Sequence, residues 1–323
     1  MRSGSSASVL TVYIPFYIAP KSFLGGKRSV FLHLLKHPTV QSLSGLFEAL
    51  KYGSRYLDSR RDNLDPWAFL GRSLWSLAGI ESHKIIVYVY TNADYEVFDE
   101  FIANYPRSSR FQIIYQRVVL QELIHPYMLT WVPRKQMKLD IKNGNEQSLY
   151  LYLEHDIDFR SENLNYFVNW RRRLQDGIIP GFMLVEWNSV GKFWSNFQIE
   201  LHDFQIGSRL TLDGFRFIPL KQPYCPVLLL DQILAEEFLQ SEFFELENFI
   251  EMQSQFKLLT RESAAIGMTY FGKERHYQVR SYVGFQEENK FPTVGAIVRH
   301  MPNIYSDSDS VAQCKSPLIK IWT

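Results

Sequence analysis

Cysteines, long apolar runs and an excess of either charge are all scarce in this chain. Only Cys225 and Cys314 occur among 323 residues, and they form no metal-type pair, which excludes a disulfide framework and a zinc knuckle and favours a reducing compartment. No run of about 18 apolar residues occurs, so we expect no membrane-spanning helix. With 35 basic and 34 acidic residues the net charge is only +1, whereas nucleic-acid-binding domains usually carry a basic excess. These absences predict a soluble, cytoplasmic protein with no nucleic-acid partner and no membrane span.

The composition is that of a folded globular protein. Hydrophobic residues make up 46% of the chain and aromatic residues 15%, which excludes a disordered protein because enough apolar surface is present to build a core. The length suits one large domain or two modest ones. Because no linker, internal repeat or low-complexity segment divides the sequence, we predict a single domain over residues 1–323, with insertions.

Short β-branched and aromatic runs alternate with segments of helical period, and this order predicts an α/β fold with a mostly parallel twisted sheet flanked by helices. The run at 84–90 is typical of a parallel strand buried on both faces. Alternation between 197 and 217, with a turn at Leu212-Asp213-Gly214, predicts a smaller antiparallel sheet. Further strands are expected at 9–18, 111–119, 149–153 and 181–187, and helices at 95–105, 129–143, 163–174, 231–240 and 261–268.

The strand predicted at 149–153 runs into a cluster of acidic residues. If its extended geometry continued, Glu154, Asp156 and Asp158 would project to one side, because side chains alternate along a strand. The carboxyl end of a strand in an open α/β sheet is where ligands bind, and carboxylates there suit Mg²⁺ or Mn²⁺ carrying a diphosphate. The alternative is a solvated turn, in which aspartate is common.

This Glu-x-Asp motif and five further blocks, in the same order along the chain, resemble a little-characterised group of GT-A glycosyltransferases with a DxD-type motif. Two positions depart from the pattern: His155 stands where such motifs usually carry an acid, and Pro226 where the group has glycine. The resemblance covers roughly residues 9–322. The five blocks are His125-Pro126-Tyr127-Met128-Leu129-Thr130-Trp131, Ile179-Pro180-Gly181-Phe182 with Glu186 closing its strand, Pro223-Tyr224-Cys225-Pro226, Arg261-Glu262-Ser263-Ala264-Ala265-Ile266-Gly267 and Val298-Arg299-His300-Met301-Pro302-Asn303-Ile304-Tyr305.

The resemblance implies a GT-A-like fold and a metal-dependent glycosyltransferase. Such an enzyme moves a sugar from a nucleotide-diphosphate donor, UDP- or GDP-linked, to a hydroxyl of a carbohydrate or glycoconjugate acceptor, and we expect inversion at the sugar centre. Residues 9–160 would form the nucleotide-sugar-binding half and residues 161–323 the acceptor-binding half. The implied cofactor is Mn²⁺ or Mg²⁺.

For the metal, the resemblance implies Asp156 as a direct ligand, because the last acid of the motif holds the ion in related enzymes. It also implies a late histidine, His300, since a neutral imidazole is a competent ligand for Mn²⁺. The alternative for His300 is a buried ring bonded to a backbone carbonyl. Asp158 is either an auxiliary ligand or the cap of the helix expected near Asn163. Glu154 would approach the ribose or the donor sugar.

The ends of the first two strands are expected to meet the nucleotide. Phe16 can stack on a base, and Asn92 or Asp94 can read its hydrogen-bonding edge, although Asp94 also suits a helix cap. Arg134 begins a helix, where a cation can meet a diphosphate; the alternative is an exposed basic face. The expected nucleotide-sugar contacts are Pro15, Phe16, Asn92, Asp94, Arg134, Glu154 and His155.

Two carboxylates are candidates for the catalytic base that takes the proton of the acceptor hydroxyl. The resemblance implies Glu262, because related inverting enzymes place the base at a helix start after the acceptor-side turn and Glu262 begins a short Ala-rich helix, although a glutamate there also complements the helix dipole. Glu186 is the rival base or an acceptor-binding group. Trp187 and Tyr224 are expected on the acceptor side, with a core position as the alternative for Trp187.

Two other functions are compatible with these residues. A nucleotidyltransferase of related fold also pairs carboxylates with a metal, but the Gly-rich basic loop expected after its first strand is absent here. A nucleotide- or sugar-binding module without turnover is the second alternative, and His155 is its best support.

Overall fold

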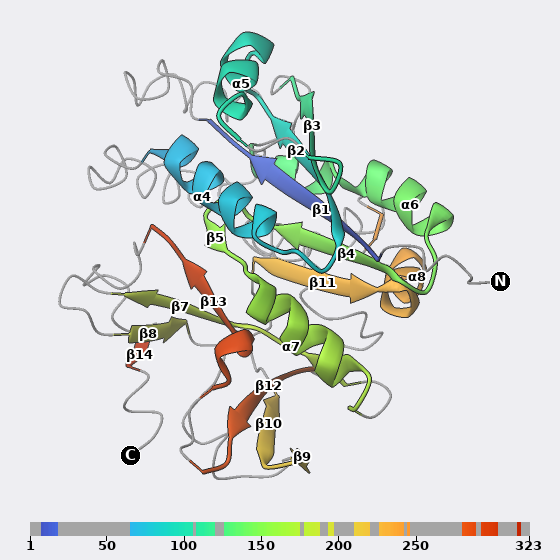
Figure 1. Cartoon of the computed structure of the whole chain (residues 1–323), viewed down its shortest axis with the longest axis vertical. Helices are drawn as coiled ribbons and strands as arrows, with labels where there is room; N and C mark the ends of the chain where they lie inside the picture. Colours follow the sequence, from blue (N-terminus) through green and yellow to red (C-terminus); the bar gives the residue numbers. More distant parts are fainter. Residues whose placement is uncertain are drawn as a thin grey trace, which may run out of the picture.

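The computed structural model describes residues 8–18, 65–105, 108–119, 126–174, 178–187, 193–196, 210–219, 226–241, 244–245, 280–288, 292–302 and 315–317 (Figure 1). Within these ranges, no helix has both the length and the apolar character needed to cross a bilayer.

A five-stranded sheet forms the centre of the fold, in the order β11-β4-β1-β2-β3. The strands β1 to β4 run parallel, and β11 pairs antiparallel with β4 at one edge. The α/β class with a mostly parallel sheet is therefore confirmed, and its four parallel strands are apolar runs that the sequence indicated, whereas β11 was not predicted. Their bounds are Val9–Phe16 (β1), Lys84–Thr91 (β2), Phe111–Arg117 (β3), Ser148–Leu153 (β4) and Val227–Asp231 (β11).

Helices cover both faces of this sheet. Side chains three positions apart on β1 point to opposite faces: Phe16 packs edge-on against Trp67 of α4, whereas the Tyr13 hydroxyl donates to Asp140 of α6 at 2.7 Å. Figure 1 shows α4 and α6 on opposite sides of the strands accordingly. The helices are α4 (Pro66–Ala78), α5 (Tyr95–Ile102), α6 (Arg134–Asn143), α7 (Ser161–Arg171) and α8 (Gln232–Leu239).

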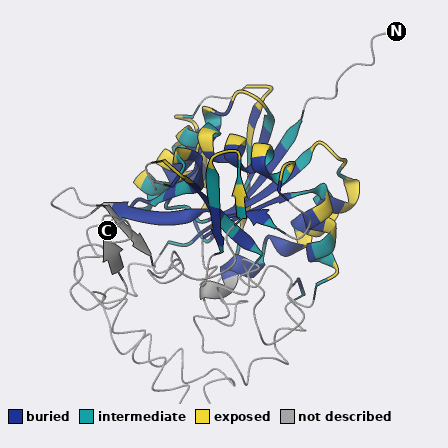
Figure 2. Ribbon diagram, turned by 90° about the horizontal axis from the view of Figure 1, so that it is seen from below, coloured by how far each residue is buried: buried dark blue, intermediate teal, exposed yellow. Residues whose placement is uncertain are grey.

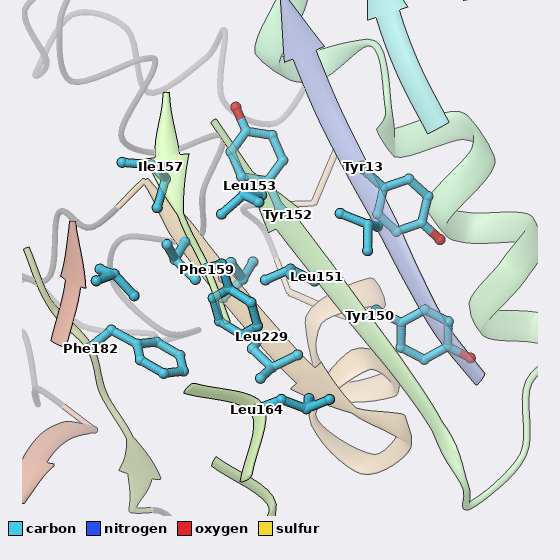
Figure 3. Packing of buried hydrophobic residues seen from close by; sticks show 14 of the residues in the cluster. Tyr13, Tyr150, Leu151, Tyr152, Leu153, Ile157, Phe159, Leu164, Phe182 and Leu229 are labelled. Atoms are coloured by element: carbon cyan, nitrogen blue, oxygen red, sulfur yellow. The ribbon is translucent and has the colours of Figure 1, made fainter. Parts of the chain in front are cut away.

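The core lies between these layers. The rings of Tyr13 and Tyr150 point to the α6 side of β1 and β4, and Leu151 and Phe159 lie on the other side (Figure 3). All four side chains are buried. Figure 2 shows the central strands buried and the exposed residues along the outer faces of the helices. Because β1 and β4 are covered on both faces, they carry continuous apolar runs instead of strict alternation.

Two smaller sheets accompany the central one, with the orders β6-β12-β10-β9 and β14-β8-β7-β13-β5. The predicted turn is confirmed: Asp213 and Gly214 have positive φ (50° and 76°) and join β9 to β10. Both sheets are mixed and not purely antiparallel, because β12 pairs parallel with β6 and β13 with β7. Local alternation predicts strands but cannot specify such distant pairings. The strands are β5 (Ile157–Asp158), β6 (Ile179–Pro180), β7 (Met183–Trp187), β8 (Phe193–Asn196), β9 (Leu210–Leu212), β10 (Phe215–Pro219), β12 (Ser281–Gln286), β13 (Ile297–His300) and β14 (Lys315–Pro317).

The helix predicted over 129–143 is divided in two. A 3₁₀ helix, η3 (Pro126–Trp131), ends before α6 begins at Arg134. Pro133 occupies the N-cap position of α6, and a proline has no N–H to continue a helix from the preceding turn. The helix expected at 261–268 lies outside the described residues.

Gly295 allows a second 3₁₀ helix, η6 (Val294–Ala296), to approach α7 closely. Asn163 of α7 donates from Nδ2 to the carbonyl oxygens of Gly295 and Ile297, at 2.9 and 2.7 Å. A Cβ atom at position 295 would lie 2.5 Å from the Glu162 carbonyl oxygen and 2.5 Å from the Tyr166 Cβ atom.

We expect Gly295→Ala to lower the free energy of unfolding by about 1–3 kcal/mol, the usual cost of overpacking a site that cannot relax. Urea unfolding measures the change. Gly79→Ala is the matched control, because the nearest atom to its Cβ would be 3.4 Å away. Equal stability of the Gly295 variant and the control would contradict close packing at η6.

Candidate functional site

The candidate site lies where the strand order of the central sheet reverses. The chain passes from β1 outward to β3 and then returns to β4 on the other side of β1. At such a switch point the loops after the two neighbouring strands diverge and leave a crevice for ligands. Phe16 ends β1 and Glu154 directly follows β4, so both belong to this edge. The Phe16 ring lies 5.2 Å from the His155 ring, which joins the two strand ends.

The acidic segment after β4 is a turn held by α4. The Ile157 N–H donates to the Glu154 carbonyl at 3.2 Å, which closes the turn. The Ser73 hydroxyl of α4 lies 2.8 Å from both the His155 and the Ile157 carbonyl oxygens. Extended geometry therefore stops at Leu153, and the expectation that three carboxylates share one side is wrong. The turn directs the side chains of Asp156 and Asp158 toward different partners.

Asp158 is directed toward basic and hydroxyl partners. Its carboxylate accepts from Arg160 at 2.5 and 3.0 Å and from the Ser76 hydroxyl at 2.7 Å. Burial raises the pKa of Asp158, but the hydrogen bonds from Arg160 and Ser76 outweigh burial and hold this pKa below its ordinary value. Asp158 does not cap α7, because the Asn163 side chain accepts from the Arg160 N–H at 2.8 Å instead. The ion pair accounts for this carboxylate without a metal.

His300 brings the end of β13 against the turn. Its Nε2 atom lies 3.2 Å from Asp156 Oδ2, and its Nδ1 atom is hydrogen-bonded to Glu186 Oε1 of β7. The Met301 N–H donates to the Asp156 carbonyl at 2.9 Å and fixes the backbone beside this contact. All three side chains are at most 15% exposed. The structure thus brings together three of the predicted residues, Asp156, His300 and Glu186.

The two carboxylates change the electrostatics of the imidazole between them. Burial alone would lower the pKa of His300, but the charges and hydrogen bonds of Asp156 and Glu186 raise it to about 10. Burial would raise the pKa of Asp156, but the charge and hydrogen bond of His300 lower it to about 2. Burial lowers the pKa of the neighbouring His155. At neutral pH His300 is therefore a buried cation and His155 is neutral.

Once His300 Nε2 has released its proton, Asp156 and His300 have the chemistry and spacing of two ligands of one divalent cation. Ligand atoms about 2.1 Å from an ion and at about a right angle or somewhat more are roughly 3–3.4 Å apart, and Asp156 Oδ2 and His300 Nε2 are separated by 3.2 Å. Asp156 Oδ1 is buried and has no hydrogen-bond partner in the part of the chain that the structure describes. No group of three or more His, Cys, Asp or Glu side chains among the described residues is arranged as a metal site. The pair accordingly offers two protein ligands, and other ligands would complete the coordination.

The nucleotide-contact residues predicted at the ends of the first two strands make contacts within the protein. Asn92 accepts from the Ile18 N–H at 2.8 Å and donates to the Ile18 carbonyl at 2.7 Å, so it fixes the chain leaving β1. Asp94 forms an exposed ion pair with Arg117 at 2.7 Å and makes no side-chain cap at α5. Pro15 lies within β1, beside Tyr90 of β2. These contacts shape the sheet edge around Phe16.

Other predicted residues contribute no side-chain geometry to the site. Glu262 and Tyr224 lie outside the described residues, and Trp187 is described only as the last backbone position of β7. Arg134 is buried at the start of α6, so the alternative of an exposed basic face is wrong for this residue. Sequence reasoning missed Ser73 and Ser76 of α4, for which the only signal was two small hydroxyl residues three positions apart on one helix face.

A comparison of the chain with protein-family models finds no match, and a search of curated protein sequences finds no significant match either.

The His300 contacts predict a dependence of stability on pH. The folded-state pKa of His300, about 10, lies above its ordinary value of 6.5. Its contribution to stability is therefore complete below about pH 6.5 and is lost as the pH rises toward 10. We expect the free energy of unfolding to fall by on the order of 2–4 kcal/mol over this interval. Urea unfolding at several pH values measures it.

His300→Gln is the control for that measurement, because lysine and tyrosine side chains also titrate at the upper end of the interval. The difference in pH dependence between the parent and His300→Gln isolates the histidine. An identical pH profile for the two proteins would contradict the charged state of His300.

Proposed function

We propose that the chain is a metal-dependent glycosyltransferase of the GT-A type, which moves a sugar from a UDP- or GDP-linked donor to a hydroxyl of a carbohydrate or glycoconjugate acceptor, with inversion. The observation that carries the proposal is the Asp156–His300 pair at the strand-order reversal of a mostly parallel sheet. The resemblance in the sequence predicts that an acidic residue after the fourth strand, here Asp156, lies close to a late histidine, here His300. Residues 9–160 would serve the donor and residues 161–323 the acceptor.

In this proposal Asp156 and His300 would hold Mn²⁺ or Mg²⁺, and the remaining ligands would come from outside the protein. When bound, the ion supplies charge stabilisation for the departing diphosphate. Glu154 is left to accept hydrogen bonds from the ribose or the donor sugar. Phe16 is too deeply buried for open stacking, so it would form a wall of the nucleotide site together with His155.

Glu186 acts in the proposal on the histidine and not on the acceptor. Its carboxylate accepts from His300 Nδ1, which leaves Nε2 as the nitrogen that faces Asp156. A carboxylate behind a ligating histidine fixes the tautomer and the orientation of the ring. The base that takes the acceptor proton would then be Glu262, with Trp187 and Tyr224 beside the acceptor.

A nucleotide-binding module without turnover is the second candidate. It is favoured by one observation: His155 stands in a position that is usually acidic, and its ring is packed against Phe16. Such a module would bind a nucleotide without transferring a sugar. A nucleotidyltransferase of related fold would bind nucleoside triphosphates in preference to diphosphates.

Thermal unfolding with a panel of nucleotides tests the proposal. Nucleoside diphosphates, nucleoside triphosphates and nucleotide sugars are each added with Mn²⁺ and with a chelator. We expect UDP or GDP, and one of their sugars, to raise Tm only with Mn²⁺, by an amount that grows with ligand concentration. Slow metal-dependent hydrolysis of that sugar nucleotide separates an enzyme from a binding module. If no nucleotide raises Tm with or without Mn²⁺, the proposal fails.

A further inference from the structure

Arg134 is a buried arginine among aromatic rings at the start of α6. Its side chain is only 6% exposed. Its guanidinium carbon lies 4.3 Å from the ring centre of Phe238 in α8, 5.1 Å from that of Trp131 and 5.2 Å from that of Phe244. None of its three guanidinium nitrogens has a hydrogen-bond partner in the part of the chain that the structure describes.

The rings satisfy only part of what a guanidinium requires. Cation–π contacts act on the flat faces of the group, whereas its five N–H donors point outward in the plane. Burying those donors without acceptors costs several kcal/mol. The carboxylate whose charge acts on Arg134, that of Glu245, forms an ion pair with Lys138 on the surface. Burial lowers the pKa of Arg134 to about 9, so the group remains a cation at neutral pH.

The position of Arg134 suits a ligand with negative charge. Because α6 leads into the parallel strand β4, its first turn lies at the carboxyl edge of the sheet, as does the turn that carries Asp156. Free N–H groups and the positive end of the helix dipole favour anions at the start of a helix. A planar guanidinium there can bind two oxygens of one anion at once. The unpartnered arginine and the helix start therefore indicate the same chemistry.

We propose that Arg134 and the first turn of α6 form a binding site for a phosphate-type oxyanion, with Trp131, Phe238 and Phe244 as walls that hold the guanidinium in place. The anion is either a free inorganic phosphate or pyrophosphate, or the diphosphate of a nucleotide. The site requires no metal. It stands independently of the proposed glycosyl transfer.

Calorimetric titration of the full chain with inorganic phosphate, pyrophosphate and nucleoside diphosphates, all without metal, tests the proposal. We expect Arg134→Met to abolish the binding seen in the parent protein, and Lys142→Met, which removes an exposed cation from the last turn of α6, to leave it within twofold. Arg134→Lys keeps the charge but loses the planar fork, so its affinity should fall about tenfold or more. If Arg134→Met does not fold, the anion affinity of Arg134→Lys provides the test instead.

Stability provides a second readout. A binding group without a partner weakens the apo protein, so Arg134→Met should raise the apo Tm by about 2 °C or more. If Arg134 serves only to fasten α8 to α6, Arg134→Met lowers Tm and leaves anion binding unchanged, which overturns the proposal. Absence of binding of every anion to the parent overturns it as well.

The arms of the titration also identify the source of the anion. Arg134-dependent binding of phosphate or pyrophosphate supports a free anion, and Arg134-dependent binding of nucleoside diphosphates alone supports the nucleotide. Failure of the glycosyltransferase proposal leaves this result intact, because that failure is a missing Mn²⁺-dependent response. Conversely, a Mn²⁺-dependent nucleotide response that is unchanged in Arg134→Met excludes the nucleotide as the source of the anion and leaves the glycosyltransferase proposal intact.

Discussion

We expect Asp156→Asn to abolish the Mn²⁺-dependent stabilisation of the chain by nucleoside diphosphates that the proposed function predicts. The substitution keeps the volume of the side chain but removes the charge that faces His300 Nε2 and the unpartnered Oδ1. Without that carboxylate the pair provides one ligand in place of two. We also expect the apo protein to lose about 1–3 kcal/mol of unfolding free energy, because a hydrogen bond to a charged, buried group is weakened. Thermal unfolding with and without Mn²⁺ measures both effects.

Two further variants show whether the effect is specific to Asp156. Asp158→Asn breaks the ion pair with Arg160 and should lower apo stability while the Mn²⁺ response persists. Asp99→Asn, at an exposed position of α5, should change neither. A full Mn²⁺ response in Asp156→Asn would remove the basis for the metal site, and its loss in Asp158→Asn would restore Asp158 as an auxiliary ligand.

If His300 is a metal ligand, we expect Glu186→Ala to weaken Mn²⁺ binding by about 10–100-fold, the usual effect of losing the carboxylate behind a ligating histidine. The reason is that Glu186 is the acceptor for His300 Nδ1, and without it neither the tautomer nor the ring orientation is fixed. Glu186→Gln retains an acceptor oxygen and should recover most of the affinity. Electron paramagnetic resonance of the free Mn²⁺ ion measures these affinities without any knowledge of the donor or the acceptor.

Loss of the catalytic base would have the opposite effect, because it would lower turnover and leave Mn²⁺ binding unchanged. If Glu262 takes the acceptor proton, Glu262→Gln leaves Mn²⁺ and donor affinity unchanged and lowers sugar transfer by about 10²- to 10⁴-fold. Glu186→Ala with unchanged Mn²⁺ affinity but without transfer would show that Glu186 is the base. The two carboxylates are thus distinguished by binding as much as by turnover.

The central sheet could be predicted from the sequence because its strands are apolar runs with few competing interpretations. The segment at 84–90 forms a strand as predicted, with one face buried and the other half-buried over most of its length. Strand ends also predicted the positions of Phe16 and Asp156, since the carboxyl ends of parallel strands meet at one edge. The prediction failed at the residues after Leu153, where alternation was continued through a turn.

The contacts that complete the site could not be predicted, because they join residues far apart in the chain. Ser73 lies 84 positions from the Ile157 carbonyl that it anchors, and Glu186 lies 114 positions from His300. The local pattern of apolar and polar residues does not indicate which distant side chains will be in contact. The histidine was suspected only through the resemblance, and its carboxylate partner was assigned to the acceptor instead.

The distance along the chain between Asp156 and His300 has a consequence for synthesis on the ribosome. The strands β1 to β4 are all translated by residue 153, whereas His300 follows Asp156 by 144 residues. At about 5–20 residues per second, the histidine emerges roughly 7–30 s after the aspartate. During this interval a nascent chain can form its parallel sheet, but the aspartate has no partner on β13. Translation products that stop before β13 would therefore fold in part and remain unable to form the Asp156–His300 pair.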